Sequence, residues 1–216
     1  MHHWSHPVSS RRLGQRPGAR AAGWLVRMAV LVLSGSMTAV AAPPDNGSPL
    51  KSQFTTLSLS QCEIVKRHAD GNSWLCPGLP GYPVYVAEGD LRFFMGFGPQ
   101  AQKTRASTQT LGAFNTVFKD NRSRFTIEWR YVRRQGRDIP HAAIVRFFTS
   151  LDKNRGQVLV VTRIAETEAC HVGYIDALAN VHSAIALARS IADDKARTFD
   201  CKSEPQSYGA TGRSPL

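Results

Sequence analysis

Two histidines and an aspartate lie close together near the end of the chain and are candidates for acid–base chemistry. They are His171, Asp176 and His182. A histidine beside a carboxylate can act as a general base when the two converge in a cleft. Strand alternation, however, directs His171 away from the face that carries Cys170. Asp176 would then shape the turn before a helix, and His182 would lie in the first turn of that helix. The sequence favours these structural roles and keeps the three residues only as weak catalytic candidates.

Basic residues gather at one predicted strand end, where they could bind an anion. They are Arg130, Arg133, Arg134 and Arg137, with Lys103 and Arg105 in a separate polar loop. Such a patch could bind an anionic envelope component, for example lipid head groups, lipopolysaccharide or another polyanion. The alternative is a solvated rim that keeps the protein soluble. The Pro- and Gly-rich loop at 76–83, which lies beside a predicted disulfide, could expose Tyr82 for binding, since rigid loops often carry binding residues; the alternative is a simple turn of the chain.

Other signals for chemistry are weak. Glu128 and Arg130 share a strand face, which indicates either a small polar site or an exposed, self-paired surface. The sequence has no phosphate-binding loop, hydrolase elbow or metalloprotease motif. Cys170 and His171 are neighbours, but the paired ligand spacing of a zinc site is missing, so no metal or cofactor is expected. Strand alternation buries Trp129 and Tyr131, so no stacking platform is evident and no nucleic-acid partner is expected.

The first forty residues have the pattern of an export signal. Five arginines and no acidic residue precede the uncharged, largely apolar stretch 28–42, which contains Ala39-Val40-Ala41. A basic segment, a short apolar run and an A-x-A site predict a signal peptide over 1–41. The alternative is an uncleaved anchor helix, although the apolar run is short for a membrane span. We therefore expect a periplasmic or secreted protein that does not span the membrane after cleavage.

Removal of the signal changes the interpretation of the charge. The chain of 216 residues has a formal net charge of +11, and five arginines belong to the predicted signal. The remaining 22 Lys and Arg against 16 Asp and Glu leave a moderately basic protein. Apolar residues make up 42% and charged residues 20%, close to the average for globular proteins, which excludes collagen, coiled coil and wholesale disorder.

All four cysteines follow the predicted signal, and an even number in an exported chain predicts disulfides. Cys62 and Cys76 flank a segment with an Asp70-Gly71 turn, so their bond would close a hairpin. Cys170 lies in a predicted strand, and a helix over about 181–199 would return antiparallel to it. The end of that helix would bring Cys201 beside Cys170. We therefore expect the pairs Cys62–Cys76 and Cys170–Cys201.

The elements that must position these residues are mostly strands. Period-2 alternation is clearest over 125–134, and further strands are expected over 142–149, 158–165 and 169–175. The segment 83–98 resembles a hairpin with its turn at 88–90. The prediction is an α+β fold: an antiparallel meander of six to seven strands with one C-terminal helix, capped at Asn180 and packed on the sheet. A flexible arm over 42–53 and a flexible tail over 203–216 would flank a single domain over 54–202.

Four phrases of the mature sequence resemble a family of small exported alphaproteobacterial proteins of unknown function. They are CPGLPGYPVYVAEGDLR, IEWR, ACHVGYIDALAN and ARSIADDKARTFDC, spread from about Cys62 to Cys201. The resemblance implies export and a single domain, and it supplies no catalytic residue.

The sequence favours a non-enzymatic binding or accessory module of the cell envelope. Its partner would be an anionic envelope component or a periplasmic protein. Two alternatives remain: a small periplasmic hydrolase that uses a His/Asp pair, and an inhibitor of a secreted enzyme.

Overall fold

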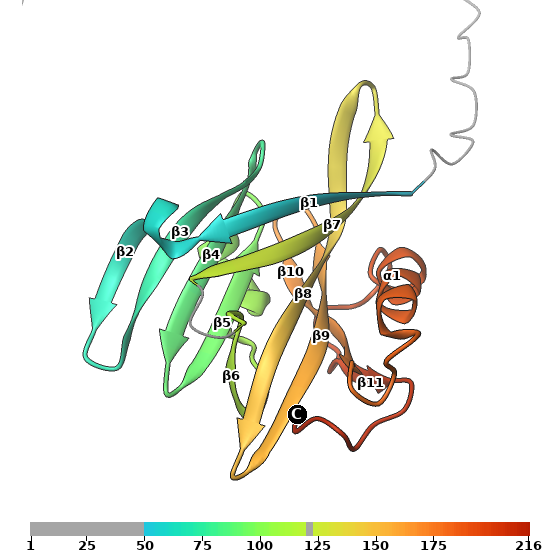
Figure 1. Cartoon of the computed structure of the whole chain (residues 1–216). Helices are drawn as coiled ribbons and strands as arrows, with labels where there is room; N and C mark the ends of the chain where they lie inside the picture. The colour runs from blue at the N-terminus through green and yellow to red at the C-terminus, as the bar shows by residue number, and fades with distance from the viewer. Residues whose placement is uncertain (1–49, 120–122) are drawn as a thin grey trace, which may run out of the picture. The chain divides into compact units, whose positions relative to one another are not determined.

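The computed structural model describes residues 50–119 and 123–216, which form two β-sheets and one α-helix (Figure 1). A four-stranded antiparallel sheet has the order β2-β3-β4-β5, and a seven-stranded sheet has the order β1-β7-β8-β9-β10-β11, with β6 paired to β8. The strands of the smaller sheet are β2 (Glu63–His68), β3 (Gly71–Leu79), β4 (Tyr82–Gly89) and β5 (Arg92–Phe97). Those of the larger sheet are β1 (Lys51–Ser58), β6 (Phe114–Thr116), β7 (Arg124–Arg134), β8 (Arg137–Leu151), β9 (Asn154–Ile164), β10 (Ala169–Asp176) and β11 (Gln206–Tyr208). The helices are α1 (Ala184–Asp194) and three short 3-10 turns, η1 (Leu59–Gln61), η2 (Ala101–Lys103) and η3 (Arg105–Thr108).

The predicted α+β class with antiparallel strands fits this architecture, but the predicted single meander does not. The described residues contain eleven strands in two sheets, where six to seven were expected. The larger sheet is mixed, because β11 runs parallel to β10. The extra strands include β6 and β11, which have three residues each and are too short to show alternation.

The central strands of the larger sheet are buried on both faces. Strands β8 and β9 alternate apolar side chains between the two sides, as period-2 geometry requires. One set packs against the smaller sheet: Ala143, Val145, Phe147, Val158 and Val160. The other set packs under α1: Ala142, Ile144, Leu159 and Val161. The fold therefore has three layers, with the smaller sheet and α1 on opposite faces of the larger sheet (Figure 1).

The helix is shorter than the sequence suggested. It begins at Ala184 after Ser183, so Asn180 is not its cap. The Asn180 side chain instead donates to the carbonyls of Asp176 and Ala210, at 2.8 and 2.7 Å. The buried face is rich in alanine, as expected, and consists of Ala184, Ala188, Ile191 and Ala192. Small side chains let the helix axis approach the sheet closely.

Both predicted disulfides are present. Cys62–Cys76 closes the β2–β3 hairpin, and Cys170–Cys201 joins β10 to the segment that follows α1. The chain has no free cysteine. Two structural disulfides indicate an oxidising compartment outside the cytoplasm. Among the described residues, no helix is both long and apolar enough to cross a bilayer.

The predicted arm and tail are both more structured than expected. The signal over 1–41 and residues 42–49 lie outside the described residues, but Lys51 already begins β1, which pairs with β7 from end to end. The C-terminal segment adds β11 to the sheet and buries Ser214. The polar C-terminal sequence could not predict this ordered structure, because the group that holds the segment in place is one carboxylate that is distant in sequence.

That carboxylate belongs to Asp176. It accepts hydrogen bonds from the backbone of Leu178 and Ala179, from the backbone of Arg213 and Ser214, and from the Ser214 hydroxyl, at 2.6–3.1 Å. Burial by itself would raise the pKa of Asp176, but the hydrogen bonds from Ser214, Arg213 and Ala179 outweigh it and lower the pKa. Asp176 thus fixes the turn after β10 and holds the C-terminus against the sheet.

We expect Asp176→Asn to lower the free energy of unfolding by about 2–3 kcal/mol, because an amide cannot accept all of these bonds and its NH2 group meets backbone donors. Urea unfolding measures the loss. Asp152→Asn, at an exposed position in the β8–β9 turn, is the matched control and should change stability by less than about 0.5 kcal/mol. Equal losses for the two variants would contradict the role of Asp176.

Candidate functional site: an arginine-lined cleft

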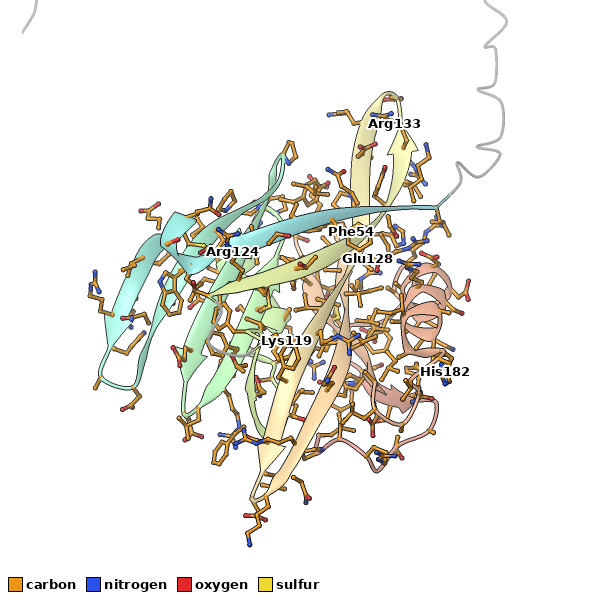
Figure 2. The ribbon with its side chains drawn as sticks, in the orientation of Figure 1. Phe54, Lys119, Arg124, Glu128, Arg133 and His182 are labelled. Carbon is orange, nitrogen blue, oxygen red and sulfur yellow. A yellow bond between two sulfur atoms is a disulfide. The ribbon has the colours of Figure 1, made fainter. Side chains whose placement is uncertain are left out.

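The structure places the three weak catalytic candidates in separate surroundings. His171 is only 1% exposed, and its Nδ1 lies 3.0 Å from the Tyr174 hydroxyl. Asp176 is committed to the C-terminal segment, as described above. His182 lies exposed in the turn before α1, where Figure 2 labels it beside the helix. Within the described part of the chain, no hydrogen bond or ion pair joins His171 or His182 to the Asp176 carboxylate, so the geometry does not assemble the His/Asp pair that a hydrolase would need.

Burial also removes His171 from acid–base work near neutral pH. Desolvation, with a smaller effect of Arg105, lowers the pKa of His171 to about 3. Burial, with a smaller effect of Glu204, raises the pKa of Tyr174 to about 12. Both rings therefore stay neutral over the physiological range and form an uncharged pair inside the protein.

Glu128 and Arg130 do contact each other, with Oε1 and Nη1 3.9 Å apart, but their strand face is not exposed. They are 6% and 8% exposed and lie beneath α1. Arg130 donates from Nε and Nη2 to the two carboxylate oxygens of Asp193, at 2.9 and 2.6 Å. Glu128 accepts from the Nε of Arg189 at 2.6 Å and from the Ser52 hydroxyl at 2.5 Å.

These helix partners were missed by the sequence reasoning. Arg189 and Asp193 are four residues apart, so they lie on one side of α1, next to its alanine stripe. Opposite charges at this spacing on the helix, matched to Glu128 and Arg130 on the strand, are the signal that could have found them. The pairs attach α1 to β7 through charge as well as through apolar packing.

An open cleft of about 980 Å³ brings together most of the predicted binding residues. Its walls come from the end of the β7–β8 hairpin, the β3–β4 turn, the chain after β9 and the chain after α1. Tyr82, Arg133, Arg134 and Arg137 all line it, so the Pro/Gly-rich loop and the basic strand end face one cavity. Figure 2 labels Arg133 near the tip of the hairpin. Arg130 is not part of the lining, because it is buried under α1.

Three basic residues of the lining were not predicted: His141, Arg163 and Arg197. Arg163 lies on β9, and its Nη1 donates to the carbonyls of Ala196 and Arg197, at 2.9 and 2.5 Å. This contact fixes the chain after α1 at the cleft. The sequence could not place these residues together, because β8, β9 and the end of the helix meet only in the folded protein.

His141 is the most unusual group of the cleft. It is 8% exposed, and neither ring nitrogen has a hydrogen-bond partner among the described residues. Its Nε2 lies 3.5 Å from Oδ1 of Asp193. Burial lowers the pKa of His141, although Asp193 acts in the opposite direction, and Arg197 and Arg130 lower it further. The ring is therefore neutral near pH 7 and has donor and acceptor capacity that the protein does not use.

The cleft is electropositive. Five arginines line it, against the carboxylates of Asp138 and Glu166. Arg133 contacts Asp138 at 3.0 Å, which offsets part of this charge. Guanidinium groups suit carboxylate and phosphate because their planar fork can donate two parallel hydrogen bonds. The arrangement can hold an anion; the described residues contain no group of three or more His, Cys, Asp or Glu side chains suited to a metal ion.

Comparisons of the chain with models of known families, with curated proteins and with solved structures return no match.

The buried ion pair under α1 should be essential for stability. We expect Asp193→Asn to lower the free energy of unfolding by about 3 kcal/mol, because the Arg130 guanidinium would stay buried without its counter-charge. Thermal and urea unfolding measure the effect. The neighbouring Asp194→Asn, at an exposed position, is the control. The double variant Arg130→Met/Asp193→Leu should lose much less stability than the single variants Arg130→Met and Asp193→Leu lose together. A loss equal to their sum would contradict the pairing.

His171 should make stability depend on acid. Its pKa is lower in the folded than in the unfolded chain, so the unfolded state binds more protons between about pH 6.5 and pH 3. The contribution of the neutral, buried His171 ring to the free energy of unfolding is complete above about pH 6.5. It falls by about 1.4 kcal/mol per pH unit as the pH falls through this window. In His171→Gln this part of the slope should disappear, as measured by urea unfolding at several pH values. Tyr174→Phe should keep it, because Tyr174 does not titrate in acid.

Proposed function

We propose that this protein is an exported, non-enzymatic binding module that takes an anionic component of the cell envelope into the arginine-lined cleft. One observation carries the proposal: five arginines and a buried histidine without a hydrogen-bond partner line a single cavity of about 980 Å³. A cavity of this size accommodates a group larger than a simple ion. The predicted signal peptide and the two disulfides support work in the periplasm or after secretion.

The chemistry of recognition follows from the lining. The arginines would bind phosphate or carboxylate groups in bidentate fashion, while Tyr82 and Pro80 of the β3–β4 turn would contact the apolar part of the ligand. His141 would donate a hydrogen bond from its buried ring. A bound anion would also favour protonation of His141, because it would add a negative charge near the ring, which lines the cleft.

No observation favours the two alternatives in the same way. A His/Asp hydrolase would need convergence of residues that have separate contacts here, and nothing distinguishes an inhibitory surface from any other exposed loop.

Charge reversal in the cleft should weaken ligand binding. With inositol hexaphosphate as the probe, we expect Arg134→Glu/Arg137→Glu to weaken the affinity at least tenfold, as measured by titration calorimetry at low salt. Affinity of the unaltered protein should fall as salt rises, because the attraction is electrostatic.

The control is Lys153→Glu/Arg155→Glu, which makes the same change of charge at the opposite end of β8. Affinity should stay within about twofold of the unaltered protein. If both double variants weaken binding equally, net charge and not the cleft is responsible. If the unaltered protein does not bind the probe, the proposed function fails.

A further inference from the structure

A second cavity adjoins the arginine-lined cleft. It has a volume of about 530 Å³, and its lining includes Lys103, Arg105, Glu168 and Lys202. Arg163 and Ala165 line both cavities, so the chain leaving β9 forms their common border. The two cavities therefore lie next to each other on the surface. We call their combined linings the basic track.

Most of the net positive charge of the described residues lies along the basic track. The described part of the chain contains 21 Lys and Arg against 14 Asp and Glu, an excess of seven. The track contains eight of these cations, Arg133, Arg134, Arg137, Arg163, Arg197, Lys103, Arg105 and Lys202, against Asp138, Glu166 and Glu168. Five of the seven excess charges are therefore concentrated on this one surface. Charge that served only solubility would be dispersed over the surface and not concentrated in two adjoining cavities.

The track is held rigidly by the fold. At its centre, Arg163 is tied to the chain after α1, and the backbone amide of Ala165 donates to the carbonyl of Glu168 at 2.7 Å. In the second cavity, Arg105 donates to the carbonyls of Cys201 and Ser203 and to the Glu204 carboxylate. The disulfide Cys170–Cys201 fixes the same wall to β10. A rigid site binds with a smaller loss of conformational entropy.

The free cations of the second cavity are its lysines. Arg105 already contacts Glu204 at 2.6 Å, but Lys103 and Lys202 are exposed and have no ion pair with a described carboxylate. Their position beyond Arg163 extends the positive surface past the cleft. A ligand with one compact anionic group would fill only the cleft, whereas a chain with repeated anionic groups could contact both cavities.

Among chain-like polyanions, the lining favours an acidic polysaccharide. Single-stranded nucleic acid is usually held by aromatic side chains that stack on bases, and among the described residues the two linings contain one Phe, Tyr or Trp side chain, Tyr82. A flat lipid surface does not reach into concave cavities. We propose, on the basis of the proposed function, that the ligand is an acidic polysaccharide chain that lies along the basic track and crosses it at Arg163.

The test compares short and long probes on variants of each cavity. The probes are a sulfated heparin-type disaccharide and the corresponding octasaccharide, titrated into the full chain with both disulfides formed. We expect Lys103→Glu/Lys202→Glu to weaken binding of the octasaccharide at least tenfold and binding of the disaccharide by less than twofold. The octasaccharide should also show a steeper dependence of affinity on salt, because it displaces more counter-ions from more contacts.

Two controls separate this inference from the proposed function. Lys153→Glu/Arg155→Glu should leave octasaccharide binding within about twofold. Arg134→Glu/Arg137→Glu should weaken both sugars and inositol hexaphosphate. If Lys103→Glu/Lys202→Glu leaves the affinity for the octasaccharide unchanged while Arg134→Glu/Arg137→Glu lowers it, the ligand does not extend along the basic track. The proposed binding in the cleft would still hold. If a twenty-residue oligothymidylate binds as tightly as the octasaccharide, the assignment to a polysaccharide is overturned.

Discussion

The burial of β8 and β9 on both faces is the constraint on which the rest of the structure depends. One face takes the aromatic and aliphatic core against the smaller sheet, and the other takes the alanine stripe of α1. Each CH₂ group removed from water contributes about 0.8 kcal/mol, so both layers are strongly held to the same two strands. Strand β8 is fifteen residues long. At one end, its hairpin with β7 forms a wall of the cleft.

Charge is used differently inside and on the surface. Under α1, opposite charges are matched closely, with Arg130 on Asp193 and Glu128 on Arg189. Such buried pairs add little net stability compared with apolar residues, but the loss of one partner is costly, so they specify where the helix lies. Along the cleft, positive charge exceeds negative charge, which leaves attraction for a partner. His141 connects the two regions, since it lines the cleft and lies 3.5 Å from Asp193.

Contacts between residues far apart in sequence, which we call clasps, hold together parts of the fold outside the apolar core. Two disulfides fix the β2–β3 hairpin and the chain after α1, and the Asp176 carboxylate gathers the C-terminus. The Cys170–Cys201 bond and the Arg163 contacts hold the segments that border the two cavities. Small domains commonly use such clasps because their apolar cores are limited in size. Here the clasps also keep the basic surface in one arrangement, which would reduce the conformational entropy lost when the proposed ligand binds.

Local pattern determined much of this protein. Alternation predicted the strand that became β7, and apolar segments predicted those that became β8, β9 and β10. A turn signal predicted the β2–β3 hairpin and its disulfide, and strand and helix lengths predicted Cys170–Cys201. Each of these depends on neighbours in the chain or on simple element lengths. The same reasoning placed Arg133, Arg134, Arg137 and Tyr82 on candidate binding segments. It could not divide the strands between two sheets, bury Glu128 and Arg130, or bring His141, Arg163 and Arg197 to one cleft. Those outcomes depend on which faces pack together, and packing is decided by contacts between residues far apart in sequence, which no local pattern records.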